Sequence, residues 1–334
     1  MIEKTIIAEI GQAHDGSLGI LHSYIDALKT TGITTVKFQV HIADAESSTF
    51  EPFRVRFSYH DATRFDYWRR MELTPRQWLE IKEHCEDVGL EFMASPFSQA
   101  AVDLLEDIGV KRYKVGSGEI LNYLLLEKLK LTGKPLIVST GMSSFFEIDE
   151  VVGFLKEGNC DFSLMQCTTA YPVDAVDIGL NVIGELKVRY GVPVGLSDHS
   201  GTVWPSVAAA SLGANLFEFH VVFDRRMFGP DSGASLTIDE VKNVVEGINY
   251  IGKSIVNPVD KNSIKKFSSL RSSFGKTLAL NRDMKKGELL FFEVLEGKKP
   301  AGYGIPASDF GAVIGKSLAC DKFRGEFLSY KDIL

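Results

Sequence analysis

Residues 34–40 read TTVKFQV, a short run of β-branched and apolar residues that encloses a lysine. It is one of eight such runs before residue 223: TIIAEIG near 5–11, TTVKFQV near 34–40, LEFMASP near 90–96, KRYKVGSGE near 111–119, PLIVSTG near 135–141, FSLMQCT near 162–168, VPVGLSD near 192–198 and LFEFHVV near 216–222. Several runs are almost continuously apolar, which is typical of parallel strands covered on both faces.

Segments of helical character separate these runs, and several of them close with a glycine suited to a helix C-cap. The runs start about 20–30 residues apart, which is the length of one strand–helix unit. Eight such units predict a (β/α)8 barrel, or TIM barrel, over residues 1–255.

Composition narrows the class of protein. The chain has 334 residues, of which 45% are hydrophobic, so it can build a sizeable core and is not a disordered chain. Its 37 lysines and arginines stand against 44 acidic residues, and this net charge of −7 argues against a nucleic-acid binder. No apolar stretch approaches a membrane span, and no secretory leader precedes the four widely spaced cysteines. We therefore expect a cytoplasmic protein without disulfides.

The character of the sequence changes after the last barrel helix. A polar and basic stretch predicts a linker over residues 256–270. Residues 271–334 consist of short β-like pieces between turns, and NRDMKKGELL at 281–290 resembles CDKFRGEFLS at 320–329. We expect a small β-rich second domain there.

One interval within the barrel is longer than the others. Residues 41–73 separate the second run from the helix that starts near Thr74. Insertions at the carboxyl ends of barrel strands usually build the active-site mouth or a lid, so we expect this one to face the substrate. A solvated excursion is the alternative.

Polar residues close every run, and the active sites of (β/α)8 barrels collect at the carboxyl ends of the strands. We therefore expect a polar ring around one mouth, made of Glu9, Lys37, Gln39, Ser95, Lys114, Ser117, Glu119, Ser139, Thr168, Thr169, Tyr171, Ser197, His199, Glu218 and His220.

Two lysines of this ring, Lys37 and Lys114, lie within apolar runs, where an unpaired ammonium would be costly. With serines nearby, they suit a small substrate that carries a phosphate and a carboxylate. The alternatives are buried structural ion pairs with Glu9, Glu119 or Glu218, and a Schiff base at one lysine.

Two histidines, His199 and His220, close successive runs, which would bring them to neighbouring strand ends within reach of one ion. Imidazole and oxygen surroundings suit Mn, Fe, Co, Zn or Mg, whereas the alternative is two hydrogen-bonded histidines without a metal. His14 in GQAHDG is either a third site histidine or a loop residue. Cys167 ends a run with no evident base beside it, so we expect it to pack and not to act as a nucleophile.

Eight motifs carry a resemblance to a known family. They are AEIGQAHDGS at 8–17, VKFQ at 36–39, ASPFS at 94–98, YKVGSGE at 113–119, STGMSS at 139–144, CTTAYP at 167–172, GLSDHSGT at 195–202 and FEFHVVFDRRMFGPDSGASL at 217–236. Together they resemble the sialic acid synthase family. RDMKKGELL at 282–290 with KPAGYGIP at 299–306 resembles that family's antifreeze-like (SAF) domain.

The resemblance implies an activity. This is the condensation of phosphoenolpyruvate with an open-chain N-acylated hexosamine-type sugar, which releases phosphate by C–O cleavage and gives a nine-carbon 2-keto-3-deoxy acid. It implies a divalent ion, Mn²⁺ ahead of Mg²⁺ or Co²⁺, and a homodimer in which the SAF domain covers the partner's barrel.

The resemblance also implies roles for individual residues. The metal ligands would be His199 and His220, with Glu9 in acid–base catalysis or water positioning and Glu218 as a supporting carboxylate. Phosphoenolpyruvate would lie at Lys37, Ser95, Lys114, Ser117, Ser139 and Ser197, and the sugar at Gln39, Thr169, Tyr171, Asp231 and Lys299.

Departures from the family pattern concern the sugar. Ala13 stands where the family usually has Asn, Phe219 interrupts its E-K-H motif, and Ser232 replaces the His of GPDH. The family's R-P-G motif in the SAF domain begins here with Lys299, which lacks the planar fork of arginine. We therefore expect a sugar other than N-acetylmannosamine to be possible, including the di-N-acetylated 6-deoxyhexoses of legionaminic or pseudaminic acid synthesis.

Two other functions compete with this one. A phosphoenolpyruvate–phosphosugar synthase of the octulosonate or heptulosonate type would need more cations at the mouth, which the insertion offers as Arg54, Arg56, Arg64, Arg69 and Arg70. A catalytically retired barrel whose SAF domain serves as a sugar-binding module would explain the departures at Ala13, Phe219 and Lys299.

Overall fold

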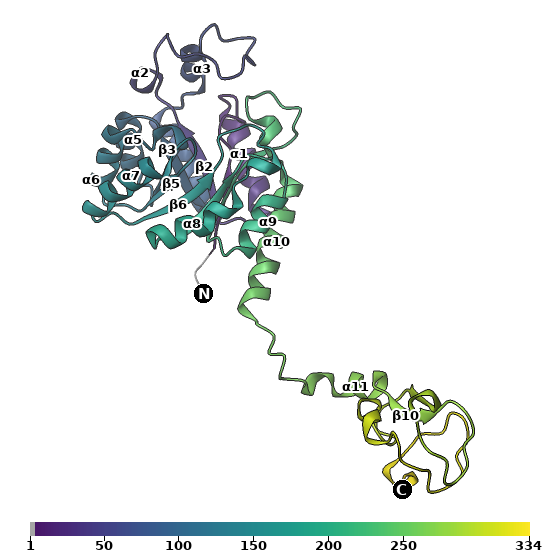
Figure 1. Cartoon of the computed structure of the whole chain (residues 1–334). Helices are drawn as coiled ribbons and strands as arrows, with labels where there is room; N and C mark the ends of the chain where they lie inside the picture. Colours follow the sequence, from purple (N-terminus) through teal and green to yellow (C-terminus); the bar gives the residue numbers. More distant parts are fainter. Residues whose placement is uncertain (1–3) are drawn as a thin grey trace. The chain divides into compact units, whose positions relative to one another are not determined.

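The first compact unit of the chain is a closed barrel. A computed structural model describes residues 4–334 and divides the chain into residues 1–257 and Pro258–Leu334. Eight parallel strands follow one another around the barrel, and β1 pairs with β8 to close it: β1 (Thr5–Glu9), β2 (Thr35–Val40), β3 (Glu91–Pro96), β4 (Tyr113–Val115), β5 (Leu136–Ser139), β6 (Phe162–Cys167), β7 (Val194–Asp198) and β8 (Leu216–Val222) (Figure 1). The predicted (β/α)8 barrel is confirmed.

All eight predicted runs contain a strand, but one of them is much shorter than expected. The run near 111–119 forms β4 only over Tyr113–Val115. Beyond it, Gly116 leads into a 3₁₀ helix, η1 (Ser117–Glu119). The strand therefore ends at Val115, one residue beyond Lys114, and the GSGE stretch turns at the mouth of the barrel.

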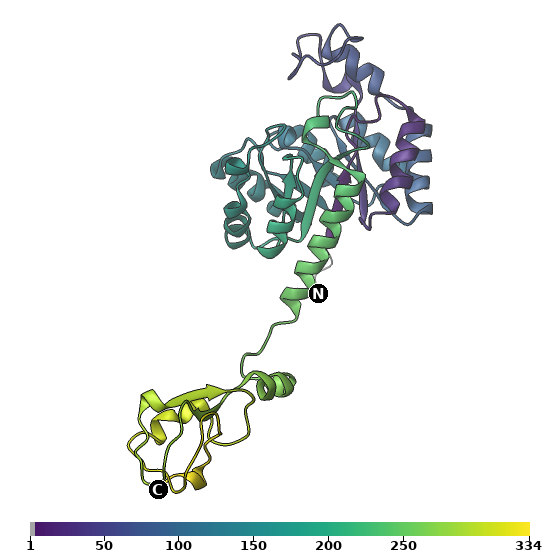
Figure 2. The ribbon, with the colours of Figure 1, turned by 90° about the vertical axis from the view of Figure 1, so that its right-hand side faces the viewer.

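Helices surround the strands (Figures 1 and 2). They are α1 (Leu18–Lys29), α4 (Pro75–Asp87), α5 (Gln99–Ile108), α6 (Tyr123–Leu131), α7 (Phe145–Glu157), α8 (Leu180–Tyr190), α9 (Trp204–Ser211) and α10 (Ile238–Val256), the last preceded by a short strand β9 (Leu236–Thr237). Local sequence sets their ends: Thr74 and Gln77 form a capping box ahead of α4, and Gly109 ends α5 with a φ of 77°.

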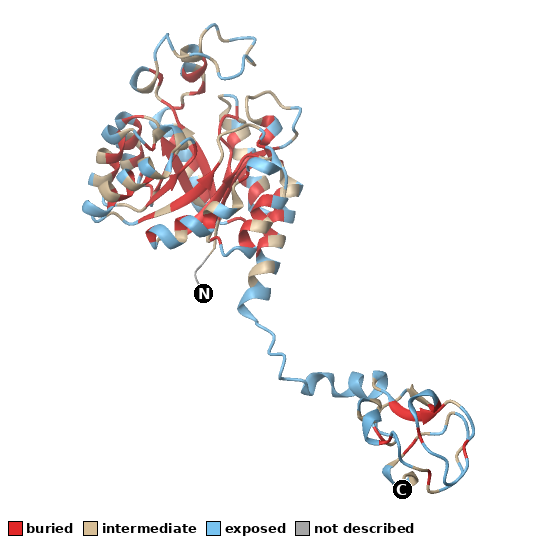
Figure 3. Cartoon of the chain, viewed as in Figure 1, coloured by how far each residue is buried: buried red, intermediate tan, exposed pale blue. Residues whose placement is uncertain are grey.

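The barrel is filled in layers. The strands are buried on both faces, and the helices bury only the face turned toward them (Figure 3). Inside the barrel, a separate apolar cluster consists of Ile7, Met93, Ile137, Met165 and Leu216. Side chains two residues apart on a strand point to the same side, so a second layer follows directly above. It contains Glu9, Ser95, Ser139, Cys167 and Glu218.

The insertion at 41–73 has a small core of its own. It contains α2 (Ala43–Glu46) and α3 (Arg64–Met71), and both views place it over the end of the barrel where the strands finish (Figures 1 and 2). Tyr67, Trp68 and Met71 are buried together, with Phe53 and Phe57 packed against them. This packing rules out a solvated excursion.

The second unit is a small domain with its own apolar core. Strand β10 (Thr277–Leu280) pairs antiparallel with β11 (Leu295–Lys298), and short bridges join the remaining turns. One bridge joins Met284 to Lys322, which occupy the two similar segments seen in the sequence. The predicted linker over 256–270 is partly helical, because α11 (Ser268–Phe274) begins within it.

Within residues 4–334, no helix combines the length and apolar character needed to cross a membrane. All four cysteines are free thiols.

Candidate active site

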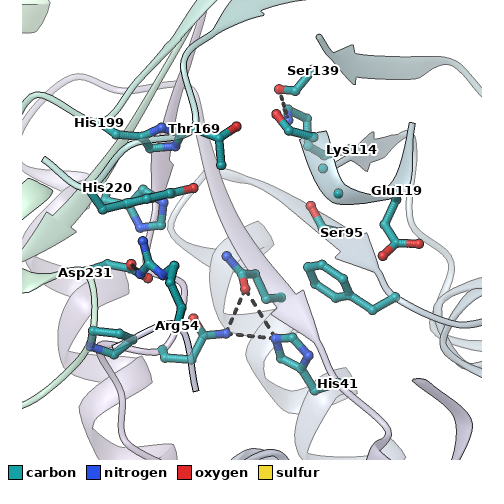
Figure 4. Close-up of a pocket in the computed structure, with 18 of the residues that line it drawn as sticks. His41, Arg54, Ser95, Lys114, Glu119, Ser139, Thr169, His199, His220 and Asp231 are labelled. Carbon is teal, nitrogen blue, oxygen red and sulfur yellow. Dashed lines mark hydrogen bonds and ion pairs between the residues drawn. The ribbon is translucent and has the colours of Figure 1, made fainter. Parts of the chain in front are cut away.

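A cavity of about 420 Å³ opens at the carboxyl ends of the barrel strands (Figure 4). Most of the predicted site residues line it: Lys37, Gln39, Ser95, Lys114, Ser117, Ser139, Thr169, Tyr171, Ser197, His199, Glu218, His220 and Asp231. Three do not. Glu9 and Thr168 are not among the lining residues, and Lys299 belongs to the second unit.

The base of the cavity holds both lysines. The ammonium of Lys37 lies 3.2 Å from the Ser95 hydroxyl, and that of Lys114 lies 2.6 Å from the Ser139 hydroxyl. Both lysines share the carboxylate of Glu218, whose Oε1 is 3.8 Å from Lys37 Nζ and 3.6 Å from Lys114 Nζ. Two cations therefore face one shared anion, with hydroxyl groups beside each.

These charges shift one another's pKa values. Burial raises the pKa of Glu218, but Lys114 and Lys37 lower it further, so its pKa lies below the ordinary value. Burial alone would lower the pKa of Lys37, but Glu218 and Glu9 bring it above the ordinary value. The pKa of Lys114 stays lowered by burial, and Lys37 adds to the effect. An anion bound beside Lys114 would supply the negative charge that it lacks.

Glu9 is fully buried and contacts a residue that lines the cavity. Its carboxylate forms an ion pair with Lys37, and its Cα is paired in register with that of His220. Burial raises the pKa of Glu9. The role expected for it, acid–base catalysis or water positioning, stays a prediction.

A different carboxyl group lines the cavity. Glu119 ends the 3₁₀ helix after β4 and accepts a hydrogen bond of 2.8 Å from the Asn122 amide. Burial raises the pKa of Glu119. A partly buried carboxyl group with a raised pKa suits proton transfer to a substrate.

His199 and His220 face each other as predicted. Their ring centroids are 5.3 Å apart, so both imidazoles lie at one part of the cavity wall. The Nδ1 of His199 lies 3.2 Å from the Thr168 carbonyl oxygen, and a proton on Nδ1 would leave Nε2 free for a metal. Among the described residues, no group of three His, Cys, Asp or Glu side chains can hold a metal. The two histidines stay the predicted metal ligands.

One of the predicted sugar residues, Tyr171, lies beside both histidines. The Tyr171 ring is 4.2 Å from the His199 ring. The guanidinium of Arg54 also lies against the Tyr171 ring, 4.0 Å from its centroid. The same guanidinium donates a hydrogen bond of 2.5 Å to Asp231. Arg54 belongs to the insertion, and sequence analysis had named it only as a possible phosphate ligand.

Sequence analysis missed one wall of the cavity. His41 stacks on Trp68 and Phe97 with centroid distances of 3.9 and 4.5 Å, and the Gln12 amide nitrogen lies 2.8 Å from its Nε2. The same amide donates to the Gln39 side-chain oxygen at 2.7 Å. A signal was present, because Lys37 and Gln39 share a side of β2 and His41 follows the strand two residues beyond Gln39.

Several known proteins are similar to this chain over most of its length. The NeuB family model matches residues 24–259. The N,N'-diacetyllegionaminic acid synthase of Campylobacter jejuni is 32% identical over 322 residues, covering 95% of this chain and 96% of that protein. Human N-acetylneuraminate-9-phosphate synthase is 31% identical over 317 residues, covering 94% and 88%. A crystal structure of N-acetylneuraminic acid synthetase from Leptospira borgpetersenii, in complex with citrate, superposes with a TM-score of 0.70 at 28% identity, covering 81% and 92%.

Proposed function

The chain belongs to the NeuB family, a family of synthases, and from this premise we propose that it condenses phosphoenolpyruvate with an open-chain N-acylated hexosamine-type sugar. The products would be phosphate and a nine-carbon 2-keto-3-deoxy acid. The observation that carries the proposal is the paired arrangement of Lys37 with Ser95 and Lys114 with Ser139 at the base of one cavity. Two ammonium groups and adjacent hydroxyls suit a phosphate and a carboxylate on one small molecule.

The reaction joins two carbons and splits one C–O bond. C3 of phosphoenolpyruvate attacks the sugar aldehyde, whose oxygen takes up a proton and becomes a hydroxyl. Water adds to C2 and loses a proton, and the tetrahedral intermediate then releases phosphate to leave the 2-keto group. A divalent ion held by His199 and His220 would polarise the aldehyde as a Lewis acid.

Individual side chains have distinct tasks in this proposal. Lys37 and Lys114 hold the anionic groups of phosphoenolpyruvate, and Glu218 keeps both lysines charged and in place. Glu119 is our candidate for the proton donor to the aldehyde oxygen, because it lines the cavity and Glu9 does not. A Glu119→Gln variant should lose more turnover than Glu9→Gln if this division is right.

The arginines of the insertion argue against a sugar phosphate. Four of the five are held by carboxylates: Arg54 by Asp231 at 2.5 Å, Arg64 by Glu51 at 2.8 Å, Arg69 by Asp44 at 2.5 Å and Arg70 by Asp61 at 2.8 Å. An arginine whose charge is already balanced by a carboxylate attracts the phosphate of a sugar phosphate only weakly. An uncharged sugar is therefore favoured over the octulosonate or heptulosonate type of substrate.

The proposal includes the assembly and place of action. We propose a cytoplasmic homodimer in which the small second domain, with Lys299, covers the partner's barrel, as the SAF resemblance implies. Sedimentation should show a dimer. A monomer with full activity would contradict the covering role.

Phosphate release from phosphoenolpyruvate in the presence of Mn²⁺ tests the function. The sugars to compare are N-acetylmannosamine, its 6-phosphate and a di-N-acetylated 6-deoxymannose. We expect release with an unphosphorylated sugar, and a preference for the di-N-acetylated one would follow the departures at Ala13, Phe219 and Ser232. Release with the 6-phosphate alone would contradict an unphosphorylated sugar substrate, and no release with any sugar would refute the proposed function.

A further inference from the structure

Arg54 connects the insertion to two loops on the opposite part of the barrel mouth. It follows β2, whereas Tyr171 follows β6 and Asp231 follows β8. Its guanidinium contacts both, at 4.0 Å from the Tyr171 ring centroid and 2.5 Å from an Asp231 oxygen. A second contact joins the insertion to the loop after β8, because the centroid of the Phe57 ring lies 5.4 Å from that of the Phe228 ring.

The guanidinium has hydrogen-bonding capacity to spare at the cavity wall. An arginine carries five N–H groups, and the described residues accept a hydrogen bond from only one of its nitrogens, Nη2, at Asp231. One face of the plane is covered by Tyr171, so the fork is held in a fixed orientation. Arg54 is one of the residues that line the cavity.

The position of Arg54 in the cavity indicates which of the two proposed substrates it would contact. Figure 4 shows it beside Asp231 and on the side of His220, away from Lys114 and Ser139. The Tyr171 ring that it covers stacks in turn near His199, at 4.2 Å. Since Asp231 already balances its charge, Arg54 is suited to an uncharged oxygen acceptor and not to a phosphate.

We propose that Arg54 is a sugar-binding residue, which donates its free N–H groups to a hydroxyl or acyl carbonyl oxygen of the sugar while Tyr171 and Asp231 hold it in place. The inference rests on the proposed function, because it takes the second substrate to be an acylated sugar. It assigns to the insertion a direct part in sugar selection, and none in phosphoenolpyruvate binding.

Steady-state kinetics of Arg54→Ala and Arg54→Lys test this assignment, with Arg56→Ala as the matched control. Arg56 is an exposed arginine two residues away that does not line the cavity. The Arg54→Ala change should raise the KM for the sugar about 10- to 100-fold and leave the KM for phosphoenolpyruvate unchanged. Lysine should give an intermediate value, because an ammonium can pair with Asp231 but has no planar fork. The Arg56→Ala variant should match the wild type.

Two outcomes would overturn the proposal. One is an unchanged sugar KM in Arg54→Ala, and the other is an equal rise in both KM values. If the wild type releases no phosphate with any sugar, the proposed function fails, and calorimetric titration of the same sugars in the presence of phosphoenolpyruvate then decides the role of Arg54. Binding to the wild type that is weakened in Arg54→Ala would still support it, whereas equal binding or none would refute it.

Discussion

The carboxylate of Glu218 lies 3.6 Å from the ammonium of Lys114, and both side chains are buried inside the barrel. Glu218 stands two residues beyond Leu216 of the apolar cluster, so the pair marks the level at which the barrel filling changes from apolar to charged. Neither charge reaches bulk water, and each depends on the other for its solvation.

Replacing Glu218 with Gln should destabilise the fold strongly. The change leaves Lys114 without its nearest anion and removes one of two from Lys37, and breaking a buried ion pair costs about 3–5 kcal/mol. Urea denaturation measures the loss in the free energy of unfolding. The control is Glu157→Gln at the exposed end of α7, which should change stability by less than about 0.5 kcal/mol. Equal stability of the two variants would mean that the lysines do not need Glu218.

Removing divalent ions should abolish phosphate release. After treatment with EDTA, added Mn²⁺ should restore the activity. The variants His199→Ala and His220→Ala should bind Mn²⁺ more weakly than the wild type in a titration followed by electron paramagnetic resonance. His60→Ala, which removes an exposed histidine of the insertion, serves as control and should bind the ion normally. Full activity of the EDTA-treated protein would contradict a metal-dependent reaction.

His14 should make the fold sensitive to acid. It is buried, its Nδ1 accepts a hydrogen bond of 3.1 Å from the Gly16 amide, and burial, with His41 and Arg70 nearby, lowers its pKa to about 3. The unfolded chain has the ordinary histidine pKa of about 6.5, so it takes up the proton first as the pH falls. Stability is therefore complete above about pH 6.5 and is lost progressively toward pH 3.

The size of this loss is measurable by comparison. At about 1.4 kcal/mol per pH unit, the wild type should lose about 2 kcal/mol more than His14→Gln between pH 7.5 and 5.0. Urea denaturation at both pH values gives the two differences. Parallel losses in both proteins would show that His14 is not the group responsible.

A methyl group at Gly195 should prevent the barrel from closing properly. A Cβ at this position in β7 would lie 2.2 Å from the backbone oxygen of Leu216 in β8. Backbone atoms of paired strands cannot move apart without breaking the sheet, so Gly195→Ala should cost at least about 3 kcal/mol or abolish folding. The matched control is Gly153→Ala in α7, which has open space and should gain about 0.5–1 kcal/mol in thermal unfolding experiments. A stable Gly195→Ala barrel would require a shift of β8 that a crystal structure would reveal.

Much of the site was predictable because it lies on strands. Alternation places Lys37 and Gln39 on one side of β2, and strand order places His199 near His220. The depth of Glu9 was not predictable, because alternation gives a side chain its direction but not how deeply it lies. Glu9 points inward as expected and pairs with Lys37, which lines the cavity, but Glu9 itself is not among the lining residues.

The sequence by itself determined the barrel, its eight strands and the polar layer at their ends. These features depend on short apolar runs that recur at regular spacing along the chain and on the polar residues that close each run. The tertiary structure alone decided which loops meet above that layer. Arg54 and Tyr171 are more than a hundred residues apart, and the contact between them depends on how the insertion packs its own core. No local period encodes that packing, since it arises only when the closed barrel brings the ends of β2, β6 and β8 to one mouth.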